Sequence, residues 1–169
     1  ENHTEVGATS VDALEKIRLI IKLIRPKPWA KNLIVLAPAL FSGKIIEPAT
    51  ITAASLCFVA FCFCASAVYV VNDVLDCQSD RLHPRKKNRP VASGKISAPF
   101  ALALGAICAA GALAIGFLVR PTVDVFLLVY FVLMMFYALV LKHYVLLDVF
   151  AIAAGFVLRA AAGAAAAGV

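Results

Sequence analysis

The sequence predicts an all-α protein, a polytopic bundle of transmembrane helices, and three observations lead to this prediction. Hydrophobic residues make up 63% of the chain and charged residues only 15%, whereas an ordinary soluble domain is about 45–50% apolar and about 25% charged. Several uncharged runs are long enough to cross a bilayer as helices. These runs are rich in Ala and Leu and lack the strict alternation of a membrane β-barrel. We therefore expect an integral membrane protein.

A polar tail is expected at residues 1–10, followed by an amphipathic helix over residues 11–25. In that helix, apolar residues recur at helical spacing, with Lys and Arg on the opposite side. A helix of this kind lies in the membrane interface on an anionic leaflet. Pro26 and Pro28 then end it, because proline lacks the backbone N–H that continues a helix.

Residues 26–169 are expected to form one transmembrane domain with about five spans. The first covers residues 29–46 and is short, because Lys31 and Lys44 bound its apolar run and Pro38 lies within it. A run of this length can also be a re-entrant or interfacial segment. The other four runs are predicted to be full spans, at residues 49–71, 96–119, 122–141 and 144–169.

The basic residues predict the orientation in the membrane. Of the 16 Lys and Arg residues, most lie in two clusters, at residues 16–31 and 81–95. Basic residues favour the cytoplasmic side of a membrane. A cytoplasmic N-terminus places both clusters and Lys142 inside and only Lys44 and Arg120 outside. Binding of an anionic substrate is a second, compatible interpretation of the clusters. Nucleic acid is not an expected partner, because the basic residues flank spans and no aromatic platform accompanies them.

Three carboxylates and a basic run follow the span at residues 49–71. Asp73, Asp76 and Asp80 stand at i, i+3 and i+7, a spacing that puts them on one face of a helix. Like charges on one face repel one another, so a fold keeps the group most readily with a cation among them. Magnesium prefers oxygen ligands and often joins carboxylates to substrate phosphates. The alternative is a solvated loop whose acids pair with neighbouring Arg and Lys.

The neighbouring basic residues and one basic residue inside a span complete the candidate site. The run from Arg81 to Pro90 supplies Arg and Lys, which bind phosphate as bidentate and point-charge partners. His83 precedes a proline and is expected to be structural. Lys31 and Asn32 lie on the same predicted side. Arg159 is expected to face the bundle interior or a wet cavity, because an intramembrane charge is costly.

The pattern Asn72-Asp73-x-x-Asp76-x-x-x-Asp80-Arg81 resembles the first aspartate-rich motif of the UbiA superfamily of intramembrane prenyltransferases. Two further patterns are similar to its decaprenyl-phosphate phosphoribosyltransferase branch, namely Arg25-Pro26-x-x-Trp29-x-Lys31-Asn32 and His83-Pro84-x-Lys86-x-x-Arg89-Pro90. The resemblance implies nine transmembrane helices around a central cavity, with a second acidic motif in the C-terminal half. This chain matches the N-terminal part of such a fold and is expected to be truncated at its C-terminus. It departs from the branch at Pro28, where Gln is frequent.

The resemblance also implies a reaction in a bacterial-type cell membrane, with the active site on the cytoplasmic side. A transferase would move 5-phosphoribose from phosphoribosyl diphosphate to a polyprenyl (decaprenyl) phosphate, with Mg²⁺ assisting diphosphate departure. Asp73, Asp76 and Asp80 are the implied metal ligands, and the first two are the implied catalytic residues. The expected substrate-binding residues are Lys31, Asn32, Asn72, Arg81, Lys86 and Arg89.

Three questions stay open at the level of sequence. A UbiA-type enzyme that moves a prenyl group from its diphosphate to an aromatic acceptor would use the same aspartates. A membrane fragment without the second acidic motif would be inactive, its acids merely paired with Arg and Lys. Self-association into a homo-oligomer is also left open.

Overall fold

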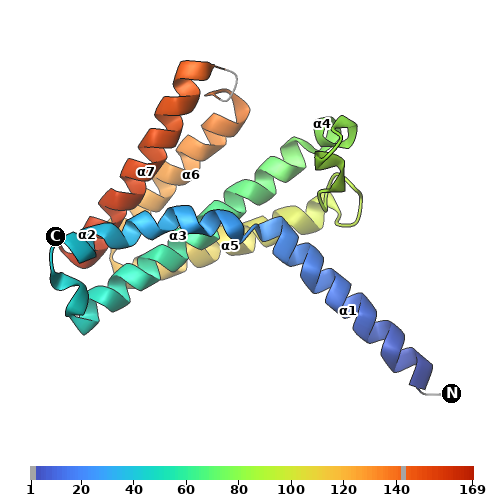
Figure 1. Cartoon of the computed structure of the whole chain (residues 1–169), viewed down its shortest axis with the longest axis horizontal. Helices are drawn as coiled ribbons and strands as arrows, with labels where there is room; N and C mark the ends of the chain where they lie inside the picture. Colours follow the sequence, from blue (N-terminus) through green and yellow to red (C-terminus); the bar gives the residue numbers. More distant parts are fainter. Residues whose placement is uncertain (1–2, 142–143) are drawn as a thin grey trace.

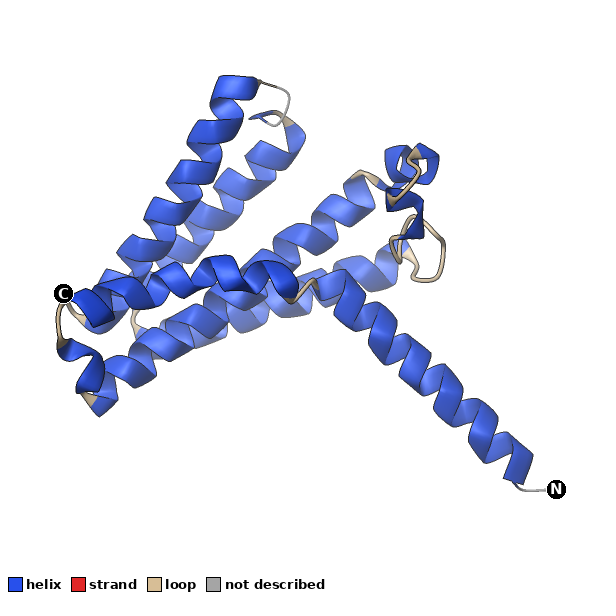
Figure 2. Cartoon of the chain, in the orientation of Figure 1, coloured by secondary structure: helices blue, strands red, loops and turns tan. Residues whose placement is uncertain are grey.

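The computed structural model describes residues 3–141 and 144–169, with side chains for 13–141, 144 and 146–169. Every regular element in these ranges is helical (Figure 2), which confirms the all-α prediction. The elements are α1 (His3–Ile24), η1 (Lys27–Leu36), α2 (Ala37–Phe41), η2 (Lys44–Ile46), α3 (Pro48–Leu75), α4 (Cys77–Leu82), η3 (Lys86–Asn88), α5 (Ala98–Val119), α6 (Pro121–Leu139) and α7 (Val145–Ala167).

Four helices, α3, α5, α6 and α7, are long and apolar enough to cross a membrane. They coincide with four of the predicted spans. Their starts follow from local sequence: Pro48 and Pro121 occupy the first helical position of α3 and α6, where the missing N–H costs nothing. Ser97 caps α5, because its Oγ accepts a hydrogen bond from the backbone N of Phe100. The chain is an integral membrane protein.

The prediction of one regular span over residues 29–46 is not met. This stretch is a 10-residue 3-10 segment, η1, followed by the 5-residue helix α2 and the short turn η2. A 3-10 helix rises about 2.0 Å per residue and an α-helix about 1.5 Å, so η1 and α2 together extend about 28 Å. The hydrocarbon core of a bilayer is about 30 Å thick. The stretched conformation therefore gives a short apolar run nearly the reach of a span.

Helix α3 lies at the centre of the bundle and packs against α5, α6, α7 and η1 (Figure 1). The turns at residues 42–47 and around Arg120 lie at one end with the C-terminus, and α4 lies at the other end. At the first end, Lys44 Nζ donates a hydrogen bond to the backbone O of Gly168 at 3.3 Å. The two basic residues predicted to lie outside thus share one end, and the clusters share the opposite one. Lys142, predicted to lie inside, is outside the described residues. Which side of the membrane each end faces remains a prediction.

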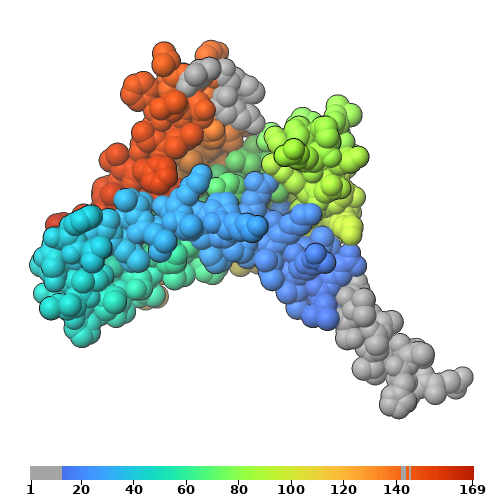
Figure 3. All heavy atoms as spheres, viewed as in Figure 1, coloured from blue at the N-terminus to red at the C-terminus, as the bar shows by residue number. Residues whose placement is uncertain are grey.

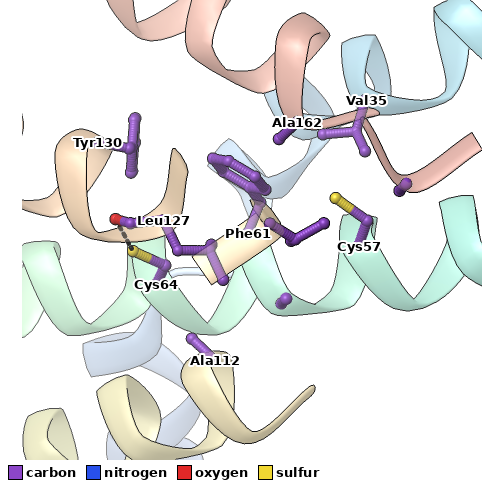
Figure 4. Close-up of a cluster of buried hydrophobic side chains, with 11 residues drawn as sticks. Val35, Cys57, Phe61, Cys64, Ala112, Leu127, Tyr130 and Ala162 are labelled. Carbon is purple, nitrogen blue, oxygen red and sulfur yellow. Dashed lines mark hydrogen bonds between the residues drawn. The ribbon is translucent and has the colours of Figure 1, made fainter. Parts of the chain in front are cut away.

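An apolar cluster packs the middle of α3 against η1, α5, α6 and α7 (Figure 4). Phe61 is fully buried, and its ring meets that of Tyr130 edge-on, with centroids 5.5 Å apart. Cys64 and Ala112 are buried in the same cluster. Small residues allow close approach elsewhere: an added Cβ on Gly163 of α7 would lie 2.0 Å from the carbonyl oxygen of Val35 in η1. Close contact through small residues is typical of membrane helix packing, and here it holds the 3-10 segment against α7.

Helix α1 begins at His3 rather than near residue 11 and leaves the bundle at an angle (Figure 1). Leu23, near its end, is fully buried in a cluster with Val70 and Ile96. The chain then turns sharply at Arg25, whose φ of 51° lies in the left-handed region. That conformation costs a residue with a side chain about 1–2 kcal/mol, so packing on both sides must stabilise this joint.

Candidate active site

The acidic stretch sits where α3 gives way to α4. Helix α3 ends at Leu75, and Asp76 caps it with φ −83° and ψ 1°, outside the helical region. The aspartates are therefore not on one continuous helix. Helical backbone hydrogen bonds continue on both sides of the break: the N of Asp76 donates to the O of Asn72 at 2.9 Å, and the N of Asp80 donates to the O of Asp76 at 2.8 Å. As a result Asp73 and Asp80 are both buried, with 1% and 2% of their surfaces exposed, and Asp76 is half-buried.

Two arginines supply the positive charge between the buried carboxylates. Arg89 Nη1 lies 2.6 Å from Asp80 Oδ2 and 3.3 Å from Asp73 Oδ1. Arg25 Nη2 donates a short hydrogen bond to the same Oδ1 of Asp73. Its guanidinium also lies 5.2 Å from the centre of the Tyr69 ring, at cation–π distance. Two carboxylates of the acidic group, those of Asp73 and Asp80, are thus paired with arginines of the chain itself. This agrees with the alternative interpretation of the sequence, in which the acids pair with Arg and Lys.

The three-carboxylate metal site that the spacing suggested is not formed by the described residues. They contain no group of three His, Cys, Asp or Glu side chains placed to hold one ion, because Asp73 and Asp80 both turn toward Arg89. Two buried oxygens, Asp73 Oδ2 and Asn72 Oδ1, nevertheless have no hydrogen-bond partner among the described residues. Such oxygens suit magnesium, which is usually held by one or two carboxylates and by substrate phosphates. The residues present fit that mode, and the assignment of Asp73, Asp76 and Asp80 as ligands stays a prediction.

A cavity of about 230 Å³ lies between η1, α3, α6 and α7. Each of these four elements contributes one polar side chain to its wall, which is also lined by apolar side chains: Lys31, Asn72, Tyr137 and Arg159. Lys31 is exposed, whereas Arg159 is only 7% exposed. The cavity is therefore a basic pocket inside the bundle, bounded by Asn72, the neighbour of Asp73.

Arg159 is held rigidly by neutral partners. Its Nε donates to Asn32 Oδ1 at 2.7 Å, its Nη2 to Tyr130 Oη at 2.7 Å, and its Nη1 to the carbonyl of Gly155 at 2.9 Å. The guanidinium also lies 4.6 Å from the centre of the Tyr130 ring. The prediction that Arg159 faces the interior is confirmed. Asn32, predicted to bind substrate, is 1% exposed and uses its Oδ1 to hold Arg159.

The other predicted substrate residues lie on the surface of the loop. Arg81 is exposed, and its Nε donates to the carbonyl of Ala92 at 3.2 Å. Lys86 is exposed at the start of η3. His83 is structural, as expected, because its Nδ1 accepts hydrogen bonds from the backbone N of Arg85 and of Lys86. Among the described residues, the ion pairs of Asp73 and Asp80 are made with Arg25 and Arg89 and not with Arg81 or Lys86.

Sequence reasoning missed two residues of the site, Arg25 and Tyr130. Arg25 belongs to a basic cluster and a quoted motif, but nothing in the sequence marks it as the partner of Asp73, 48 positions away. Tyr130 lies within an uncharged run and gives no signal for its contact with Arg159. Both contacts depend on the packing of helices that are distant in sequence.

With this geometry in place, the chain was compared with known proteins. The UbiA prenyltransferase family model matches residues 33–169. The chain belongs to this family. It is 42% identical over 156 residues to a decaprenyl-phosphate phosphoribosyltransferase of Corynebacterium glutamicum, an alignment that covers 89% of this chain and 46% of that protein. Proteins of the same name from Mycolicibacterium smegmatis and Mycobacterium tuberculosis are 38% and 34% identical and are covered to 48% and 49%. The chain spans about half the length of these curated relatives.

Solved structures agree with the fold of this UbiA-family chain. A structure of digeranylgeranylglyceryl phosphate synthase superposes with a TM-score of 0.80 at 24% identity, over 90% of this chain and 53% of that one. A UbiA homologue from Archaeoglobus fulgidus, bound to GPP and Mg²⁺, gives a TM-score of 0.73 at 24% identity, over 89% and 54%. At this identity the likeness concerns the fold, and it confirms the UbiA-like bundle.

Proposed function

We propose that this chain forms the donor-binding part of a membrane transferase that moves 5-phosphoribose from phosphoribosyl diphosphate to a polyprenyl phosphate. The observation that carries the proposal concerns two buried oxygens, Asp73 Oδ2 and Asn72 Oδ1, that have no hydrogen-bond partner in the described part of the chain. Asn72 also lines the cavity that Lys31 and Arg159 share. A cation site and a basic pocket side by side suit a substrate that carries phosphate groups. Relatives at 34–42% identity that bear the phosphoribosyltransferase name favour a sugar donor.

The chain's own residues would perform distinct tasks in this reaction. Asp73, with Asn72 beside it and Asp76 and Asp80 near it, would hold magnesium, which neutralises charge on a departing diphosphate when bound. Lys86 and Arg89, with Arg81, would grip the phosphates through charge-assisted bonds. An oxygen of the lipid phosphate would form the new bond to the anomeric carbon as the bond to diphosphate breaks. This nucleophile is already anionic, so no general base is required.

Lys31 and Arg159 would serve the second anionic group. Arg159 is buried, its hydrogen-bond partners among the described residues are neutral, and it is fixed by three of them. A fixed positive charge in a medium of low dielectric attracts an anion strongly and needs no reorganisation when the anion arrives. The pocket that it shares with Lys31 would therefore orient one phosphate while the acidic group holds the other.

A second candidate function is transfer of a prenyl group from a prenyl diphosphate to an aromatic acceptor. One observation favours it: a solved structure with this fold, the A. fulgidus homologue, was bound to GPP and Mg²⁺. The same aspartates would serve both donors. The dense basic run from Arg81 to Arg89 favours the donor with more phosphate groups.

Donor binding to the detergent-purified chain tests the proposal. Trp29 is the single tryptophan, and its Nε1 donates to Ser66 Oγ at 3.0 Å. Ser66 precedes Asn72 by six residues along α3. Its fluorescence can report titration with phosphoribosyl diphosphate or geranyl diphosphate, each with Mg²⁺ or with a chelator. We expect Mg²⁺-dependent binding of phosphoribosyl diphosphate, weakened by roughly 100-fold in D73N, the upper range for loss of a metal-site partner. E47Q, which neutralises an exposed carboxylate at the opposite end of α3, should bind normally.

Turnover distinguishes the two donors. Phosphoribosyl diphosphate with decaprenyl phosphate is offered against geranyl diphosphate with 4-hydroxybenzoate, in membranes that contain the protein. Product from the second pair alone would replace the proposal by the prenyl-transfer candidate. Binding of neither donor would leave the carboxylates as structural partners of Arg25 and Arg89.

A further inference from the structure

Two adjoining cavities lie between α1 and the segment that leads into α5, and Asp73 lines neither. The first has a volume of about 770 Å³ and is lined by polar and charged side chains, chiefly Glu15, Arg18, Lys22 and Lys95. The second has a volume of about 310 Å³ and is mainly apolar, with Leu19, Ile20, Ile96 and Phe100 in its wall. Leu19 and Lys95 line both cavities. Together they form one groove with a cationic and an apolar half.

The cationic half has more positive charge than its own carboxylate can balance. Three basic side chains face one acid, Glu15, which pairs with Lys95 at 2.9 Å. Among the described residues, the hydrogen-bond partner of Lys22 Nζ is a backbone carbonyl, that of Asn88, at 2.7 Å. Arg18 makes no ion pair or side-chain hydrogen bond with the residues that the structure describes. Two positive charges therefore remain for an anionic ligand.

The outer surface of α1 shows where the groove sits relative to a bilayer. Leu14, Ile17 and Ile21 form a stripe along α1 and are 67%, 53% and 49% exposed. Arg18 and Lys22 are one turn apart and follow the edge of this stripe. An apolar stripe buried at the acyl boundary places a bordering basic row at the level of the lipid headgroups. Figure 3 shows the described part of α1 against the loop that carries Lys95.

We propose that this groove binds one anionic phospholipid of the surrounding leaflet. Its phosphate lies between Arg18 and Lys22, and one acyl chain enters the apolar half along Ile96 and Phe100. A soluble phosphate would leave the apolar half unused. The groove opens beside the exposed stripe of α1, where bilayer phospholipids are the abundant anions. The bound lipid joins α1 to the start of α5 and so fixes the interfacial helix to the bundle.

Native mass spectrometry of the whole chain, with phosphatidylglycerol or phosphatidylcholine of matched acyl chains, tests this site. We expect one tightly held phosphatidylglycerol per chain and much weaker retention of phosphatidylcholine. R18Q/K22Q should lower the affinity for phosphatidylglycerol roughly 30-fold, because two cations are removed from the headgroup. R85Q/K87Q removes the same charge from exposed positions outside the groove and should retain the lipid.

A second pair of variants tests the apolar half without changing charge. F100A should lower the affinity for phosphatidylglycerol several-fold, whereas F117A, an exposed position toward the other end of α5, should not. Equal losses in R18Q/K22Q and R85Q/K87Q would show diffuse attraction and overturn the proposal. Binding of glycerol phosphate as tight as that of phosphatidylglycerol would also overturn the proposal, because the apolar half would then contribute nothing. Displacement of the lipid by equimolar decaprenyl phosphate would overturn it as well and would assign the groove to the acceptor.

Discussion

Replacement of Arg89 by Gln tests whether a cation is required between the two buried carboxylates. Asp73 and Asp80 are 1% and 2% exposed at their side chains, and Arg89 is 23% exposed. Removing one partner of a buried ion pair costs about 3–5 kcal/mol. Because water reaches about a quarter of Arg89 and Asp73 keeps Arg25, we expect the lower end, about 3 kcal/mol for R89Q. The free energy of unfolding is measured by SDS titration of the detergent-purified chain, followed by Trp29 fluorescence.

A double-mutant cycle separates the pair from its surroundings. D80N should lower the free energy of unfolding by about 1–2 kcal/mol. The loss is smaller than for R89Q because Arg89 still has the carboxylate of Asp73, at 3.3 Å. R89Q/D80N places two amides where the charges were and should be less destabilised than the sum of the single variants, with a coupling energy of about 2 kcal/mol. R85Q, an exposed control, should stay within about 0.5 kcal/mol of the parent. A coupling energy below about 0.5 kcal/mol would refute the reasoning, because that is the additivity error for independent sites.

The same R89Q variant tests whether a divalent ion can take the arginine's place. With Arg89 removed, the buried carboxylates of Asp73 and Asp80 lose the cation that they share, and Asp73 Oδ2 and Asn72 Oδ1 already have no hydrogen-bond partner among the described residues. Mg²⁺ should therefore raise the free energy of unfolding of R89Q more than that of the parent chain, at matched ionic strength. An equal effect on both would show that magnesium does not enter this group.

Three further predictions concern neighbouring positions. G163A should destabilise the bundle by at least about 3 kcal/mol, because its Cβ would meet the backbone of Val35, whereas G111A, which meets only the Phe63 side chain at 3.4 Å, should be nearly neutral in thermal unfolding. R25G should have a free energy of unfolding about 1 kcal/mol higher than that of R25A, because glycine adopts the positive φ of this joint without strain. Denaturant titration of the two variants measures this difference. K31Q should weaken donor or acceptor binding about tenfold with unchanged stability, whereas N32L should cost about 2–3 kcal/mol of stability, because it breaks a buried bond to Arg159.

Much of the architecture could be predicted because membrane helices leave a direct signal. Long uncharged runs between charged residues predicted four of the helices. Pro48, Ser97 and Pro121 lie at the starts of three of them. Residues 27–41 could not be predicted in the same way. Their composition is less apolar than that of the four long helices, and their 3-10 segment packs closely against Gly163 of α7, more than 120 positions away. Local sequence carries no trace of such a contact.

The site was predictable in its residue types and not in its pairings. The spacing of Asp73, Asp76 and Asp80 indicated a cation among them, because like charges on one face repel one another. The structure supplies Arg25 and Arg89 in that role. Helical spacing assumes an unbroken helix, and the break at Asp76 turns Asp80 toward Arg89. Asn32 likewise stands at a predicted position, but its Oδ1 accepts a hydrogen bond from Arg159 and its Nδ2 donates one to Cys62 Sγ.

The balance of charge explains why exposed basic residues accompany the buried group. Asp73 and Asp80 carry two negative charges, and Arg25 and Arg89 offset them with two positive ones. This closed set alone would attract a diphosphate weakly. The diphosphate must therefore be attracted in one of two ways. Either exposed cations such as Arg81 and Lys86 attract it, or Arg25 and Arg89 exchange their carboxylate partners for phosphate while a metal ion binds the carboxylates. Exposed charges raise the rate of encounter with an anion, and salt screens them. Salt screens the interaction between buried charges much less. Donor association should therefore fall steeply with ionic strength, while dissociation of the bound donor should not.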